Sequence, residues 1–176
     1  MKTLLLLLIT PLLFTACGSG PESSPETTTP VNPAISSVFR ELPDDASAVP
    51  IPEARTEKQP GDSVVLAGRI MGVMEPFIES RAVFVLGDNS VITPCSDMET
   101  DHCPTPWDAC CDPSSTRAEG TATIQIVDES GQLLRQGLEG VNGLEKLASV
   151  KVSGTVNAAS TPDSLIVNAE SIEVID

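Results

Sequence analysis

The chain has 176 residues and a formal net charge of −15 at neutral pH. This length allows one modest domain with a small hydrophobic core besides any targeting segment and tether. An acidic surface repels nucleic-acid phosphates, and only 3% of the residues are aromatic, so we expect no nucleic-acid partner.

The first 16 residues have the pattern of a secretory signal peptide. Lys2 supplies the positive start, and residues 3–14 form a leucine-rich apolar stretch that is too short to span a bilayer. The stretch runs into residues 14–17, Phe-Thr-Ala-Cys, which resemble the lipobox of bacterial lipoproteins, with phenylalanine where that family prefers leucine. The resemblance implies that residues 1–16 are removed and that Cys17 receives the lipid.

The same resemblance implies a location. Gly18, rather than aspartate, follows the cysteine, which is similar to lipoproteins that are sorted to the outer membrane. Several acyl chains such as palmitate would anchor the protein stably, because a single chain binds a bilayer only marginally. We therefore expect an envelope lipoprotein that is anchored in the outer membrane and faces the periplasm.

Residues 17–62 are predicted to form a disordered linker. Prolines interrupt any helix, and serine, threonine and acidic residues fill the intervals, so the segment cannot bury enough apolar surface to fold alone. Its prolines are Pro21, Pro25, Pro30, Pro33, Pro43, Pro50, Pro52 and Pro60. Residues 35–42 differ, because their apolar side chains recur at helical spacing; we expect this part to dock on the protein's own domain.

Alternating apolar residues predict five β-strands in the rest of the chain. The strands are expected near residues 64–71, 82–86, 121–127, 150–157 and 165–174. In the last strand the apolar phase slips by one position, which predicts a β-bulge near residues 169–171. A short helix is expected over residues 142–147, with Asn142 as its N-cap.

This order of strands and helix resembles the OB-fold, a five-stranded Greek-key barrel. We therefore expect a mainly β domain over residues 63–176 with one short helix, and a small open β-sandwich is the alternative. Gly68 and Gly154 lie inside two of the strands, where glycine suits the sharp coiling or close approach of a small barrel.

Residues 88–120 interrupt the strands and are too long for a hairpin connection. Four of the five cysteines lie here with the spacing Cys-x7-Cys-x6-Cys-Cys: Cys95, Cys103, Cys110 and Cys111. Since the lipobox places the domain outside the cytoplasm, we expect two disulfides that staple the loop. A bond between the adjacent Cys110 and Cys111 would be strained, so two pairings remain open: Cys95–Cys110 with Cys103–Cys111, or Cys95–Cys111 with Cys103–Cys110.

Other interpretations of this segment compete with the disulfides. The four thiolates, or three of them with the His102 imidazole, are alternative ligands for zinc, although the usual Cys-x2-Cys knuckle is absent. Acidic residues at 97, 99, 101 and 108 fit part of a calcium-loop count, but histidine occupies the position that requires glycine. A reducible Cys110–Cys111 pair is a further interpretation, with acidic neighbours that would raise a thiol pKa.

Trp107, the single tryptophan, also lies in this segment. We expect its ring to pack the loop on the barrel as a hydrophobic plug, and the alternative is an exposed binding surface for a partner. The sequence thus predicts a membrane-anchored, non-enzymatic lipoprotein without a cofactor, whose barrel and stapled loop bind a protein or another envelope component. A metal-binding or thiol-redox envelope module is the alternative.

Overall fold

The computed structural model describes residues 30–99 and 102–175. The predicted signal peptide, the lipidation site Cys17 and the linker up to residue 29 lie outside the described residues. Within the described part, no helix is both long enough and apolar enough to cross a membrane.

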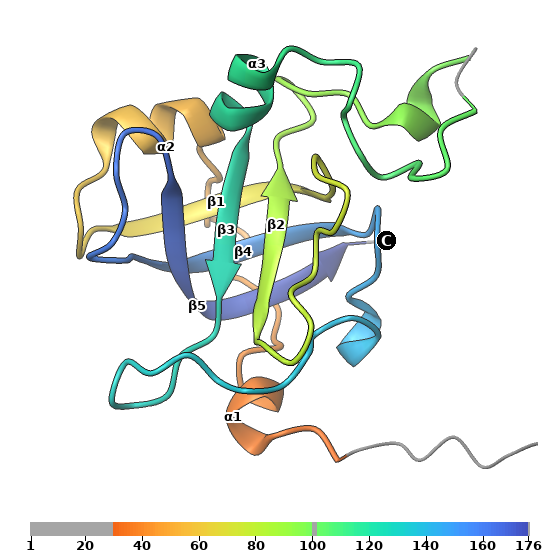
Figure 1. Cartoon of the computed structure of the whole chain (residues 1–176). Coiled ribbons are helices and arrows are strands. Elements are labelled where there is room, and N and C mark those ends of the chain that lie inside the picture. The colour runs from red at the N-terminus through yellow and green to blue at the C-terminus, as the bar shows by residue number, and fades with distance from the viewer. Residues whose placement is uncertain (1–29, 100–101, 176) are drawn as a thin grey trace, which may run out of the picture.

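Five strands close into one barrel (Figure 1). The strands are β1 (Ser63–Ile70), β2 (Val83–Gly87), β3 (Thr121–Gln125), β4 (Ser149–Val156) and β5 (Leu165–Ile175). Their order around the barrel is β1-β2-β3-β5-β4, and every neighbouring pair is antiparallel except the parallel pair of β3 and β5. The closed five-stranded barrel agrees with the predicted OB-like fold and excludes the open β-sandwich.

Alternation along the strands builds the barrel's core. In β4, half-exposed and buried residues follow each other without interruption, and Val150 and Val152 are fully buried. Phe84 from β2 and Ile124 from β3 are also fully buried. Burial of one large apolar side chain contributes about 1.5–3 kcal/mol, so this interior is the main source of the domain's stability.

Two interior glycines allow the strands to pass close to each other. A Cβ on Gly68 would overlap the carbonyl oxygen of Gly87, and a Cβ on Gly154 would overlap that of Asn168. Both positions therefore require glycine for close backbone approach, as the sequence predicts. The register of β4 against β5 shifts beside Gly154, and this shift places a bulge at residues 169–171, as predicted.

The helix expected over residues 142–147 is not formed. A single 3-10 turn, η2 (Val141–Gly143), occupies this region, and Asn142 lies inside it rather than capping it. Asn142 and Gly143 have φ values of 46° and 84°, in the left-handed region, which a right-handed helix cannot accommodate. A short helix, α3 (Ser114–Glu119), instead precedes β3, inside residues 88–120.

The described part of the predicted linker packs on the barrel, which corrects the domain boundary. We call residues 30–62 the N-terminal strap; it contains α1 (Pro33–Ser36) and α2 (Ile51–Glu57). Ile35 and Ile51 are fully buried, and docking of the 35–42 segment on the protein's own domain is confirmed. Prolines stand in the first turns of both helices, where they are tolerated, so the proline count overestimated the linker.

Candidate metal centre in the cysteine loop

Residues 88–120, which we call the cysteine loop, leave the barrel after β2 and return to it at β3. Figure 1 shows the loop at the end of the barrel opposite α1. It contains the 3-10 turn η1 (Cys95–Asp97) and α3. The described part of this segment therefore folds against the end of the barrel.

The loop has a small apolar core of its own. Ile92 and Ala109 from the loop pack on Met71, which follows β1, and all three are almost completely buried. Glycines at both ends of the loop make room for this packing, because a Cβ on Gly87 or Gly120 would lie 3.0 Å or less from a methyl group of Ile92. Ile92 and Ala109 thus pack the loop on the segment that follows β1.

Backbone hydrogen bonds join the two arms of the loop, namely the segment that leads out to Ser96 and the segment that returns from Pro106. The N–H of Cys95 donates to the carbonyl oxygen of Asp108 over 2.8 Å, and the N–H of Ser96 donates to that of Pro106 over 2.8 Å. These bonds bring Cys95 next to the arm that carries Cys110, although 15 positions separate the two residues.

Two buried aspartates support the arms. One carboxylate oxygen of Asp88 accepts the N–H of Ile51 in the strap over 2.9 Å, and the other accepts both the N–H and the hydroxyl of Ser90. The Asp108 carboxylate accepts the N–H of Ala109 over 2.8 Å and lies 4.0 Å from Arg117 in α3. The strap and α3 therefore help to position the loop.

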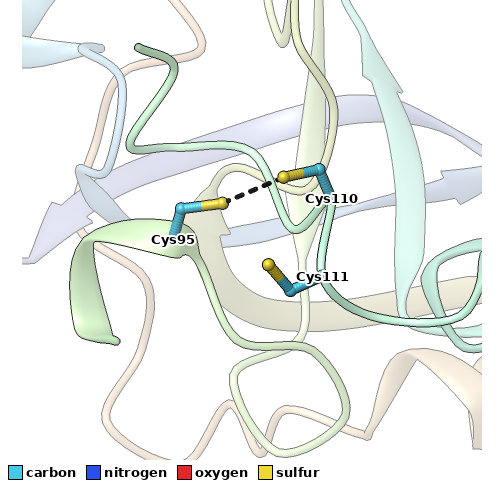
Figure 2. Close-up of side chains that lie close together, drawn as sticks. All are labelled: Cys95, Cys110 and Cys111. Carbon is cyan, nitrogen blue, oxygen red and sulfur yellow. Dashed lines mark hydrogen bonds between the residues drawn. The ribbon is translucent and has the colours of Figure 1, made fainter. Parts of the chain in front are cut away.

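The cysteine sulfurs converge between the two arms. Sγ of Cys95 lies 3.4 Å from Sγ of Cys110, which in turn lies 3.9 Å from Sγ of Cys103. The sulfurs of Cys95, Cys110 and Cys111 all lie within 4.8 Å of one another. Figure 2 shows Cys95 and Cys110 pointing toward each other from opposite arms, with the Cys111 sulfur beside them. Cys95 is buried, whereas Cys110 and Cys111 are exposed.

The predicted disulfide staple is not formed among these four described cysteines. A disulfide requires sulfur atoms about 2.05 Å apart, which is far shorter than the observed 3.4 Å between Cys95 and Cys110. Thiolates bound tetrahedrally to one ion at about 2.3 Å lie about 3.8 Å from each other. The observed separations of 3.4 and 3.9 Å bracket that value, so the arrangement suits a shared metal ion.

Hydrogen bonds shift the thiol pKa values in opposite directions. The pKa of Cys103 lies below its ordinary value, because the Thr105 hydroxyl, 3.2 Å away, and the Thr105 backbone stabilise the thiolate. The bond from Cys95 lowers the pKa of Cys110, but the bond and charge of Cys103, with partial desolvation, outweigh it and raise that pKa. Cys103 is therefore the more readily ionised of these two thiols.

The other sequence-predicted ligands lie apart from the sulfurs. His102 is exposed, and in residues 30–99 and 102–175 the sulfurs of Cys95, Cys110 and Cys111 are the single group of three or more potential ligands. The acidic residues of the calcium interpretation are not brought together: Asp97 pairs with Arg69 over 2.7 Å, and the Asp108 carboxylate binds its own arm. Asp101 lies outside the described residues.

Trp107 is half-buried at the edge of the loop. Its indole N–H donates to the carbonyl oxygen of Met74 over 2.8 Å, and its own carbonyl oxygen accepts the N–H of Gly72 over 2.9 Å. The ammonium of Lys146 stands 4.3 Å from the ring centroid, in cation–π contact. Trp107 therefore clamps the loop to the segment after β1.

Three residues that shape the site were not predicted from the sequence: Asp88, Ile92 and Thr105. Asp88 was detectable, because aspartate two positions before serine, directly after a strand, is typical of a turn closed by its side chain. The partners of Ile92 and Thr105 depend on how the loop folds back, which spacing along the chain does not reveal.

No protein-family model and no curated protein matches the chain. Among solved structures, the structure of the hypothetical protein YgiW from E. coli is similar, with a TM-score of 0.36 and 14% sequence identity. The match covers 73% of this chain and 90% of that chain. The description of the fold therefore rests on the strand order of the barrel itself.

Proposed function

We propose that this protein is a lipid-anchored envelope protein that binds one thiophilic metal ion of the zinc class in its cysteine loop. The observation that carries the proposal is the convergence of the cysteine sulfurs at 3.4 and 3.9 Å, the spacing of thiolates that share one ion. The three ligands whose sulfurs form one group are Cys95, Cys110 and Cys111. We assign Cys103 as the fourth ligand, because its sulfur lies 3.9 Å from that of Cys110. The proposal assigns no catalytic reaction.

The burial pattern favours a structural role for the ion. A site closed by four protein ligands leaves no position for substrate, and such sites contribute directly to folding. Only two loop residues, Ile92 and Ala109, belong to the small apolar core that the loop forms with Met71, so a crosslink between its arms would supply order that apolar packing does not. The metal would thus hold the cysteine loop in one conformation at the end of the barrel.

Metal analysis of full-length protein, purified in detergent under reducing conditions, tests the proposal. We expect one zinc per chain by elemental analysis. Cobalt(II) in its place should give the intense visible absorption of a tetrahedral thiolate site. Less than a tenth of an equivalent after loading with zinc, cobalt(II) or copper(I) would overturn the proposal.

Single substitutions identify the ligands. Cys95→Ser and Cys110→Ser should each abolish stoichiometric binding or weaken it at least about tenfold. His102→Ala is the matched control, because this exposed side chain borders Cys103 but lies outside the sulfur group. Full loss of metal in His102→Ala with retention in Cys103→Ser would replace the four-cysteine site by one with an imidazole ligand.

The lipid anchor is tested separately. In a Gram-negative host, the full-length chain should incorporate labelled palmitate and fractionate with outer membranes. Cys17→Ala should prevent both while the metal content of the protein stays unchanged. Unchanged labelling of Cys17→Ala would contradict the anchor and leave the metal proposal intact.

A partner-binding role is the second candidate, and one observation favours it. The Met74 side chain is 62% exposed, and the Met74 carbonyl oxygen accepts the indole N–H of Trp107, so an exposed apolar side chain lies next to the cysteine loop. A photo-crosslinking residue in place of Met74 should capture one specific envelope protein in cells, whereas the same residue at exposed Ala159 should not. Equal capture at both positions would exclude this role.

A further inference from the structure

Oxidation and metal binding compete for the cysteine thiolates of the proposed metal site. The envelope location implied by the lipobox is an oxidising environment, in which closely spaced thiols form disulfides. Coordination consumes the same thiolates that a disulfide would consume, so one pair of cysteines cannot do both. The geometry of the cluster determines which pair is oxidised first.

Cys110 is placed to react with an oxidant, and Cys95 is placed to form a disulfide with the oxidised Cys110. Their sulfurs are 3.4 Å apart and point toward each other from the two arms (Figure 2). Cys110 is exposed and meets a small oxidant from solvent, whereas Cys95 is only 2% exposed. An oxidised Cys110 sulfur would therefore face a buried thiol instead of open water.

We infer that the cysteine loop is a redox-sensitive metal site, in which a peroxide converts Cys95 and Cys110 to a disulfide and releases the ion. The inference rests on the proposed function, because it adds a regulation to that same site. It also selects one of the two pairings that the sequence left open, the one that joins Cys95 to Cys110.

The chemistry balances with hydrogen peroxide as oxidant. Binding of the ion would hold all the ligating cysteines as thiolates, so exposure selects the sulfur that reacts, and Cys110 is exposed whereas Cys103 is half-buried. The Cys110 thiolate attacks one peroxide oxygen and becomes a sulfenic acid, while the other oxygen leaves as hydroxide. The Cys95 thiolate then attacks the Cys110 sulfur, the S–S bond forms and a second hydroxide leaves. Two thiolates lose two electrons, the peroxide gains them, and two protons convert both hydroxides to water.

Loss of the ion follows from this step. The disulfide removes two of the four thiolate ligands, and Cys103 and Cys111 alone do not complete a tetrahedral zinc site. A dithiol reductant with added zinc reverses the change: the reductant becomes a disulfide, and both cysteines return as thiolates.

Peroxide titration of the zinc-loaded, full-length protein in detergent tests the inference. Released zinc is followed with a coloured chelator, and disulfides are mapped by mass spectrometry of peptides prepared without reductant. We expect zinc release and the Cys95–Cys110 linkage to appear together, and dithiothreitol with zinc to restore binding.

Substituted variants sharpen the test. With Cys103→Ser and Cys111→Ser combined, and without metal, Cys95 and Cys110 are the remaining thiols of the loop and should still form a disulfide with peroxide. Adding Cys95→Ser should leave Cys110 as a sulfenic acid that dimedone traps, and the disulfide yield at Cys110 should fall at least about tenfold. His102→Ala is the control and should release zinc as the unchanged protein does. Circular dichroism establishes that each variant keeps the barrel. Disulfide mapping of the unsubstituted protein tests the inference even if a variant does not fold.

The outcomes distinguish this inference from the proposed function. Zinc that stays bound under peroxide, or release with a linkage other than Cys95–Cys110, overturns the inference and leaves the metal site. Absence of zinc binding before peroxide overturns both.

Discussion

The barrel and the cysteine loop are stabilised in different ways. The barrel is closed by backbone pairing of all five strands around a continuous buried core. The cysteine loop has a core of three almost completely buried residues, a few backbone bonds between its arms and a group of sulfurs. The contrast indicates that apolar burial stabilises the barrel, whereas hydrogen bonds between its two arms position much of the loop.

Truncation of a buried side chain should have the largest effect on stability and should distinguish the barrel from the loop most clearly. Leu66→Ala removes a fully buried side chain from β1 and should lower the free energy of unfolding by about 2–5 kcal/mol. Ile92→Ala truncates an equally buried residue in the loop, and we expect it mainly to increase local opening there. Urea denaturation measures the first effect and amide hydrogen exchange the second. Equal losses of global stability in both variants would show that loop and barrel unfold as one unit.

A second comparison is between a glycine inside a strand of the barrel and a glycine in a connection between strands. Gly154→Ala places a Cβ against the Asn168 carbonyl and should destabilise the protein by about 1–3 kcal/mol in thermal unfolding. Gly137→Ala is the matched control, because the atom nearest to its Cβ would be 3.7 Å away, and its effect should stay within about 0.5 kcal/mol. Similar destabilisation by both changes would contradict the close approach of β4 and β5.

The pH dependence of thiol reactivity tests the loop alone. In reduced, metal-free protein, Cys103 should react with iodoacetamide at lower pH than Cys110, because the pKa of Cys103 is lowered and that of Cys110 is raised. Thr105→Val removes the hydroxyl bond to the Cys103 thiolate, so its reaction should begin at higher pH. Peptide mass spectrometry gives both profiles, and an unchanged Cys103 profile would rule out this hydrogen bond.

The smallest effect is expected for the ion pair that joins the two regions. Arg69 in β1 contacts the Asp97 carboxylate over 2.7 Å, but the Asp97 side chain is 48% exposed. Arg69→Ala should therefore change the free energy of unfolding by about 0.2–1 kcal/mol, less at high salt. A larger loss that persists in high salt would show that the arginine stem, rather than its charge, supports the loop.

Sequence patterns predicted the barrel well because alternation and phase are local properties. The five strands, the bulge and the two interior glycines each left a mark within a few residues, so no long-range knowledge was needed. The strap was misjudged because proline frequency was read as disorder, although Pro33 and Pro52 stand in the first turns of helices.

The candidate site was predictable in its residues but not in its bonding. The cysteine spacing identified the segment, and the predicted location outside the cytoplasm then favoured disulfides. The choice between disulfide and metal depends on sulfur separations, which arise from the pairing of Cys95 with Asp108 and Ser96 with Pro106 across the loop. No rule of spacing along the chain encodes that pairing.

The docking of the strap also limits how far the domain can stand from a lipid bilayer. Only 13 positions separate Cys17 from Pro30, where the described chain begins, and a fully extended segment of that length spans about 45 Å. If Cys17 is acylated as proposed, this length is the upper limit on the distance between the membrane surface and Pro30, which precedes α1. The cysteine loop lies at the opposite end of the barrel from α1 (Figure 1), so its reach from such an anchor would be set by the tether and the length of the barrel together.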